Sequence, residues 1–367
     1  MRGRLVVIAF FLILIGACVC ARFQTRLGPF QFDEGDRPQR FAFSADGKEM
    51  ISACWCKEGD FRIHRWEIAS GRRTDITLPK HPALPPGGLG PIRVPVRFSA
   101  EARLLAFGSD LNTLIYTAVS GELLHDFPMG YCEVSGDFQA LLHFSGWPKN
   151  ELIITEIPSG KLLGKIPLPP TFFHTWNLSI SDDHQTLLVG DQPGVLSIWK
   201  VQQPLKRQLR IEAPFPWEIR RGVLSPDGKT VVADANNTSL GDEDERDRSI
   251  FAWDAATGKL LWRVAANFGN YHGFSVNSER LATATDVALQ VWDVKTGAQL
   301  MRVERPEDPV ETEGDEKNPA QGGWWKPDPR FDGPLAFSPD GKMLAVIGGD
   351  RFIRLWDIAT AVELTGK

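Results

Sequence analysis

The sequence lacks the short motifs that most catalytic folds carry. Its 367 residues contain no Gly-x-Ser-x-Gly elbow, no phosphate-binding loop and no dinucleotide-binding fingerprint. No two histidines form a spaced pair that is typical of metal ligands; the seven are His64, His81, His125, His143, His174, His184 and His272. The sequence therefore predicts no catalytic residue, no cofactor, no metal site and no small-molecule substrate.

Cysteine is scarce as well, with five residues in the chain. Beyond Cys18 and Cys20, only Cys54, Cys56 and Cys132 remain, which is an odd number. Cys54 and Cys56 are two residues apart on a predicted strand, so both side chains should point to one face, and a disulfide between them would be strained. We expect small buried hydrophobic residues here, because further thiols or histidines at ligand spacing are missing.

A surplus of basic residues is also missing. The formal net charge is −5, and no basic stripe follows any segment. Nucleic acid is therefore disfavoured as a partner. The sequence has no long stretch in which apolar residues recur every 3.6 residues, and this argues against a helical fold.

What the sequence does contain is one pattern that recurs seven times. Its clearest copy, residues 335–360, reads LAFSPDGKMLAVIGGDRFIRLWDIAT. The weaker copies are anchored by Ser44, Ser99, Ser135, Ser181, Ser225 and Ser275. A unit of roughly forty residues with variable insertions is typical of propellers and solenoid arrays.

Each copy divides into four short apolar runs separated by turn residues. The first run ends at an Asp-Gly turn in three copies, and the third run carries an aromatic residue in all copies except the third, where Ile154 replaces it. A Ser-Gly or Thr-Gly turn precedes most of the fourth runs. The repeated Ser-x-Asp-Gly is turn chemistry, so we expect its serine to be structural. Many short strands at regular spacing predict an all-β array.

These residues resemble the WD-repeat family of β-propellers over residues 40–360. Trp253-Asp254, Trp292-Asp293 and Trp356-Asp357 match the dipeptide that names the family. The resemblance implies an all-β, seven-bladed β-propeller of four-stranded antiparallel blades. It also implies a non-catalytic scaffold that binds a protein partner. The Gly-His pair of well-formed WD blades is essentially absent, so these blades should depend more on aromatic packing.

Closure of the ring needs a strand from one terminus. The last copy is short at its end (362–364), whereas residues 22–27 could supply the missing strand, and we favour the latter. We expect residues 1–21 to be a signal peptide or membrane anchor, residues 22–40 a linker with this candidate closing strand, and residues 41–367 the propeller.

The N-terminus has the pattern of an export signal. Arg2 and Arg4 precede an uncharged run from Leu5 to Ala21. Residues 15–18 resemble a bacterial lipoprotein processing box, in which Cys18 would be lipidated. An uncleaved anchor and ordinary cleavage near Ala21, giving a secreted protein, remain open. All three place the propeller outside the cytoplasm, and the first two tether it to a membrane.

Three long insertions, 79–94, 235–249 and 302–333, are the strongest functional signal. In a four-stranded blade order, all three should open on one face, and function tends to lie on such loops. Residues 242–248 carry a net charge of −3 and residues 304–317 a net charge of −5. The candidate partner contacts on this face are Trp324, Trp325, Asp242, Glu243, Asp244, Trp147, Phe173 and Trp217.

These features have other interpretations as well. Charge runs in long loops are most often solvated, and Trp324 and Trp325 could pack under the rim of blade seven at the mouth of the channel. The acidic runs do not have the spacing of a recognised calcium loop, so no calcium site is predicted. Residues 252–263 look like one repeat of a quinoprotein-type propeller, which leaves a quinone-dependent dehydrogenase or a lactonase-like hydrolase as the alternative function. Only one copy fits that pattern, and no vicinal cysteine pair exists.

Overall fold

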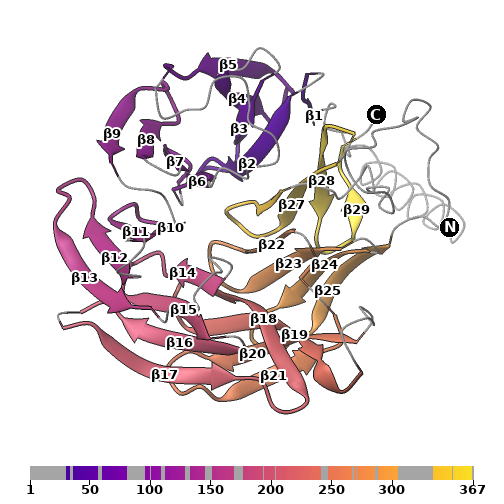
Figure 1. Cartoon of the computed structure of the whole chain (residues 1–367). Coiled ribbons are helices and arrows are strands. Elements are labelled where there is room, and N and C mark those ends of the chain that lie inside the picture. Colours follow the sequence, from indigo (N-terminus) through magenta and orange to yellow (C-terminus); the bar gives the residue numbers. More distant parts are fainter. Residues whose placement is uncertain are drawn as a thin grey trace, which may run out of the picture.

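The structure is a computed structural model. It describes residues 30–365, with the exception of 34–35, 57–59, 81–95, 100, 109–111, 129–132, 145–150, 169–176, 193, 203, 241–246, 267, 270, 286–287, 305–333 and 349. These residues form seven antiparallel sheets and one short 3₁₀ helix, η2 (Thr238–Leu240). The sheets surround a common axis as the blades of a propeller (Figure 1). The predicted all-β, seven-bladed fold is confirmed.

Four consecutive strands form each of the first six blades. Blade one consists of β2 (Arg37–Phe43), β3 (Glu49–Trp55), β4 (Phe61–Glu67) and β5 (Arg73–Thr77). Blade two consists of β6 (Val96–Phe98), β7 (Leu104–Gly108), β8 (Thr113–Thr117) and β9 (Leu123–Phe127). Blade three consists of β10 (Glu133–Val134), β11 (Ala140–Phe144), β12 (Glu151–Glu156) and β13 (Leu162–Pro167).

The next three blades follow the same order. Blade four consists of β14 (Leu178–Ile180), β15 (Thr186–Gln192), β16 (Val195–Lys200) and β17 (Lys206–Glu212). Blade five consists of β18 (Trp217–Leu224), β19 (Thr230–Asn237), β20 (Arg248–Asp254) and β21 (Leu260–Val264). Blade six consists of β22 (Tyr271–Phe274), β23 (Arg280–Ala284), β24 (Ala288–Asp293) and β25 (Gln299–Glu304).

Blade seven is completed by both ends of the chain. Its inner strands are β26 (Leu335–Phe337), β27 (Met343–Ile347) and β28 (Phe352–Asp357). One part of β28 pairs with β1 (Phe30–Gln31), and the other part pairs with β29 (Val362–Glu363). The N-terminal and C-terminal strands therefore share the outer position. The predicted closing segment, residues 22–27, lies outside the described residues.

The repeated serine builds the turn between the first two strands of a blade. In blade seven, Ser338 Oγ donates a hydrogen bond to Asp340 Oδ1 (2.6 Å) and accepts one from the Met343 N–H (2.9 Å). Gly341 takes a φ of +67°, which glycine adopts without a Cβ clash. The same pair of bonds recurs at Ser44, Ser135, Ser181, Ser225 and Ser275. The prediction of a structural serine is confirmed.

The Trp-Asp dipeptide has two structural roles. The tryptophans are buried, and Trp292 Nε1 donates to Thr283 Oγ1 (3.2 Å). The aspartate closes the next turn: Asp254 Oδ1 accepts from the N–H and the hydroxyl of Thr257 (2.8 and 2.7 Å). Equivalent bonds join Asp293 to Thr296 and Asp357 to Thr360.

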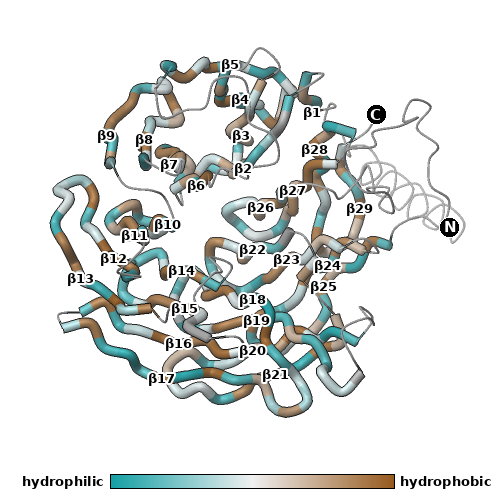
Figure 2. The backbone as a smooth tube through the Cα atoms, viewed as in Figure 1, coloured by the Kyte–Doolittle hydropathy of each residue, from teal (hydrophilic) through white to brown (hydrophobic). Residues whose placement is uncertain are grey.

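Apolar layers fill the space between neighbouring blades, because a single blade has two faces that it cannot bury alone. Between blades four and five the layer includes Leu196, Ile198, Phe251 and Trp253. The outer strands are more polar, as the hydrophilic β17 beside β16 shows (Figure 2).

The strands that flank the three predicted insertions begin and end on one face of the propeller, while most residues of the insertions lie outside the described residues. The insertions follow β5, β19 and β25. Connections between second and third strands, and those between blades, leave from the same face because the strands alternate in direction. We call this the long-loop face. Among the described residues, the structure contains no helix long and apolar enough to span a bilayer.

Candidate functional site

Of the predicted partner contacts, Trp217 lies within the described residues. The remaining candidates lie outside them, as does the lipidation candidate, and their positions are not assigned: Trp324, Trp325, Asp242, Glu243, Asp244, Trp147, Phe173 and Cys18. Residues 1–21 also lie outside the described part of the chain.

Trp217 forms part of a small exposed patch at the start of blade five. Its indole is half-buried, and the Arg263 guanidinium carbon lies 4.0 Å from the ring centroid. The adjacent Phe215 is 91% exposed. Both residues lie at the connection between β17 and β18, on the long-loop face. We call Phe215, Trp217 and Arg263 the blade-five patch.

The backbone beneath this patch is held in place. The Pro216 carbonyl accepts hydrogen bonds from the N–H of Thr238 (2.8 Å) and from its hydroxyl (2.7 Å). Arg263 Nε donates to Ser249 Oγ at 3.0 Å. An exposed aromatic ring on a fixed connection is suited to contact with another protein, since little backbone freedom is lost on binding.

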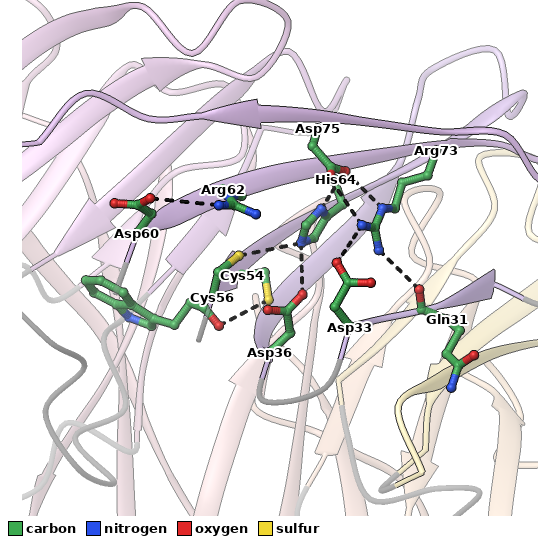
Figure 3. Close-up of polar contacts among 11 residues, drawn as sticks. Gln31, Asp33, Asp36, Cys54, Cys56, Asp60, Arg62, His64, Arg73 and Asp75 are labelled. Atoms are coloured by element: carbon green, nitrogen blue, oxygen red, sulfur yellow. Dashed lines mark hydrogen bonds and ion pairs between the residues drawn. The ribbon is translucent and has the colours of Figure 1, made fainter. Parts of the chain in front are cut away.

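A second candidate site lies in blade one, where four residues of types that can ligate a metal meet. Asp36 directly precedes β2, Cys54 lies in β3, Cys56 follows β3, and His64 lies in β4 (Figure 3). One ligand atom from each lies within 4.8 Å of the others, and all four residues are buried. We call these residues the blade-one cluster.

Strand pairing explains how this cluster forms. In the β3–β4 ladder, Cys54 lies opposite Arg62, and Ser52 lies opposite His64. Since side chains alternate along a strand, Cys54, Cys56 and His64 all point to one face of the blade. That face packs against blade seven, as the buried cluster containing Cys54, Cys56 and Ile353 shows. The expectation that both cysteines share a buried face is confirmed.

The imidazole of His64 is positioned from both sides. Its Nδ1 is hydrogen-bonded to Asp75 Oδ1 at 2.8 Å. Its Nε2 faces the cluster, 4.0 Å from Cys56 Sγ and 3.6 Å from Asp36 Oδ2. Burial lowers the pKa of His64, but the hydrogen bonds to Cys56 and Asp75 outweigh burial and the pKa is raised above its usual value.

The thiol of Cys56 is acidic for a cysteine. Hydrogen bonding with the Cys54 thiol lowers the pKa of Cys56 to about 6, against the opposing effect of burial. Close by, Asp36 Oδ2 is buried and accepts no hydrogen bond. The cluster therefore places a thiol that ionises readily next to an unsatisfied carboxylate oxygen.

An ion-pair network connects the cluster to the N-terminal segment. Arg73 Nη2 donates to Asp33 Oδ2 (2.6 Å), and Arg73 Nε lies 3.0 Å from Asp75 Oδ1. The hydrogen bond from Arg73 lowers the pKa of Asp33. Phe32 contacts the rings of His64 and Trp66, with centroids 5.7 and 5.0 Å away. Phe32 and Asp33 are thus bound against blade one.

Cys56, His64 and Asp75 have the order of a thiol–imidazole–carboxylate triad. Such a triad needs a nucleophile that substrate can reach. Cys56 is 6% exposed and His64 is fully buried, so the packing around them blocks the approach of a substrate. The arrangement is therefore better suited to holding an ion than to attacking a substrate.

The cluster does not follow from the sequence alone. Cys54 and Cys56 are predicted to share one face, but Asp36 and His64 are not at a recognised ligand spacing from them. The one available signal was the Cys-x-Cys pair on a predicted strand that continues into a hairpin containing a histidine.

No protein-family model matches the sequence, and no curated protein is similar to it in sequence. Solved structures do match in fold. The crystal structure of the C-terminal WD40 domain of Sif2 has a TM-score of 0.53 at 16% identity, covering 88% of this chain and 82% of that one. A chain in the crystal structure of the mitotic checkpoint complex has a TM-score of 0.56 at 15% identity, covering 89% and 95%. The chain therefore has the fold of a divergent, seven-bladed WD40-like propeller.

Proposed function

We propose that the chain is a non-catalytic scaffold that binds a protein partner through its long-loop face. WD40-like propellers commonly act as interaction scaffolds, and one structure of similar fold comes from a multiprotein complex. The observation that carries the proposal is the blade-five patch. Phe215 is 91% exposed beside Trp217 and Arg263, on a connection that hydrogen bonds hold in place.

The chemistry of the long-loop face favours a particular kind of partner. Aromatic and arginine side chains dominate interaction hot spots, and the blade-five patch contains both types. The acidic runs at 242–248 and 304–317 belong to insertions that leave from the same face. We infer a partner that presents a basic surface next to an extended apolar segment.

Crosslinking and pull-down from extracts of the native organism would test the partner surface. The baits are the full chain, the double variant Phe215→Ala/Trp217→Ala and a deletion of residues 304–326. A matched control is Val119→Ala, because Val119 is 60% exposed in the turn between β8 and β9, on the opposite face. We expect the first two variants to lose a partner that the control retains. Identical profiles for all four baits would refute the proposal.

We further propose that the chain is exported and tethered to a membrane by its N-terminus. The support is the sequence pattern of Arg2 and Arg4 followed by an uncharged run that contains the lipoprotein-like box at residues 15–18. Lipid labelling with a radioactive fatty acid, compared between the full chain and Cys18→Ala, would separate the modes of attachment. Loss of label in the variant indicates lipidation, and an unlabelled chain in the membrane fraction indicates a retained anchor. A chain found in the cytoplasm would contradict export.

A further inference from the structure

We propose that Asp36, Cys54, Cys56 and His64 form a zinc site that fastens the N-terminal segment to blade one. The proposal concerns the blade-one cluster and is independent of partner binding. It rests on the donor set, the separation of the donor atoms, the orientation of the imidazole and an unsatisfied buried oxygen.

The donor set matches zinc in type and in number. Structural zinc sites are tetrahedral and use thiolate sulfur, imidazole nitrogen and carboxylate oxygen. Magnesium and calcium prefer oxygen ligands only, so two sulfur donors disfavour them. Zinc–ligand bonds of about 2.0–2.3 Å separate the ligand atoms by roughly 3.3–3.8 Å. The four donor atoms here lie within 4.8 Å of one another. Even at that largest separation, an inward movement of each atom by about 0.6–0.9 Å would complete a tetrahedral coordination shell.

The imidazole is already oriented as a metal ligand. Metal-bound histidines usually donate their other ring N–H to a carboxylate, which fixes the tautomer. The 2.8 Å bond between His64 Nδ1 and Asp75 provides this arrangement and turns the Nε2 lone pair toward Cys56 and Asp36. Arg73 in turn holds Asp75 (Figure 3).

Asp36 supplies the independent observation that points to a cation. Its side chain is 4% exposed, and its Oδ2 atom is buried with no hydrogen-bond partner. Among the described residues, the nearest group that can carry a positive charge is the His64 imidazole, whose Nε2 lies 3.6 Å away, beyond hydrogen-bond distance. A buried carboxylate oxygen without a closer donor or cation is costly. A zinc ion among the four donor atoms would lie next to this oxygen and remove the cost.

Other uses of the cluster leave part of it unexplained. A disulfide between residues two apart on one strand would be strained, and it would not involve Asp36 or His64. A thiol–imidazole–carboxylate triad would leave Cys54 and Asp36 without a role. Metal coordination is the use that engages all four donor atoms.

The location gives the site a structural consequence. Asp36 belongs to the connection that follows β1, and β1 pairs with β28 of blade seven. Cys54, Cys56 and His64 belong to blade one. A zinc ion bound by all four would join the segment that completes the last blade to the first blade. Metal binding would then be coupled to closure of the ring.

Metal analysis of the purified full chain would test the proposal. We expect about one zinc per chain by elemental mass spectrometry, as a single four-ligand site requires. After zinc is removed with a chelator, Co²⁺ should give an intense visible spectrum with thiolate-to-cobalt charge transfer. Cys56→Ser should bind zinc at least about tenfold more weakly, and Asp75→Asn should weaken binding about 10–100-fold by releasing the His64 ring.

A matched control is His184→Gln, because His184 also pairs with an aspartate (Nδ1 to Asp137 Oδ2, 2.7 Å) but lies outside the cluster. It should bind zinc like the unsubstituted chain. If Cys56→Ser does not fold, the cobalt spectrum of the unsubstituted chain still decides the outcome. A chain that holds no zinc and shows no thiolate-to-cobalt band, or equal zinc affinity in Cys56→Ser, would overturn the proposal.

Discussion

Two junctions between neighbouring blades differ sharply in chemistry. The junction between blades four and five is apolar, with Leu196, Phe251 and Trp253 in its buried layer. The closing junction between blades seven and one also has apolar residues, but next to them it buries Asp36, Cys56 and His64. The second junction therefore contains groups that are costly to bury unless they are paired or bind an ion.

The difference follows from how the chain connects the blades. Blades four and five are consecutive in sequence, so the chain itself holds them together and apolar contact is sufficient. The closing junction brings together the two ends of the chain, and that closure costs more conformational entropy. Directional contacts such as those of Arg73 with Asp33 and Asp75 restrict how the N-terminal segment can lie.

The largest expected effect is at the apolar junction. Phe251 is fully buried, and its ring contacts Trp217 and Trp253 with centroids 5.6 and 5.5 Å away. Phe251→Ala should lower the free energy of unfolding by about 3–5 kcal/mol, because it removes buried apolar area and leaves a cavity. Urea titration followed by tryptophan fluorescence measures this. A loss below about 1 kcal/mol would show that the layer collapses around the gap.

A second prediction concerns the carboxyl group of Asp182, in the turn between β14 and β15 of blade four. Burial raises the pKa of Asp182 to about 6 from 3.8. Since the folded chain keeps this proton up to about pH 6 and the unfolded chain releases it near pH 4, the free energy of unfolding should fall as the pH rises between these values. Asp182→Asn should therefore stabilise the protein by about 1–3 kcal/mol at pH 7.5.

The pH dependence distinguishes this cause from a change in packing. The gain from Asp182→Asn should disappear at about pH 3, below the ordinary value of 3.8, where the carboxyl group is protonated in both states. Thermal unfolding at the two pH values is the measurement. A gain of equal size at both would mean that desolvation of the charge is not responsible.

At the closing junction, Arg73→Ala should have a moderate effect. The substitution removes the hydrogen bonds to Asp33 and Asp75, and we expect a loss of about 1–2 kcal/mol, reduced by the partial exposure of these groups. Hydrogen exchange at residues 30–33 should increase. The control is Arg72→Ala, because Arg72 is 78% exposed and pairs with Glu67 at 3.6 Å. If the two variants behave alike, the Arg73 network does not hold the N-terminal segment.

The smallest effect is expected at Glu363, in the C-terminal strand β29 that helps to complete blade seven. Glu363 Oε1 lies 3.6 Å from Arg354 Nε, but Arg354 also forms a bidentate pair with Asp350 (2.9 and 2.6 Å). Glu363→Gln should therefore change the free energy of unfolding by less than about 0.5 kcal/mol. A larger loss, measured by urea titration, would mean that β29 contributes more to closure than its two residues suggest.

Local chemistry made the propeller predictable from the sequence. Each Ser-x-Asp-Gly turn is built by contacts within a few residues, as at Ser338, and each Trp-Asp strand ends in a turn that its own aspartate closes. Because such bonds repeat along the chain, the number and type of blades follow from the pattern. The termini were harder to assign, since both pair with β28.

The sequence by itself thus determined the strands, the turns and the seven blades, because these depend on neighbours in the chain. Only the tertiary structure decided that Asp36 and His64 meet Cys54 and Cys56. That meeting depends on the register of β3 against β4 and on the contacts that hold Phe32, Asp33 and Asp36 against blade one. The spacing of these residues in the sequence does not specify the strand register or the position of the N-terminal residues, because contacts between distant segments form only when the ring closes.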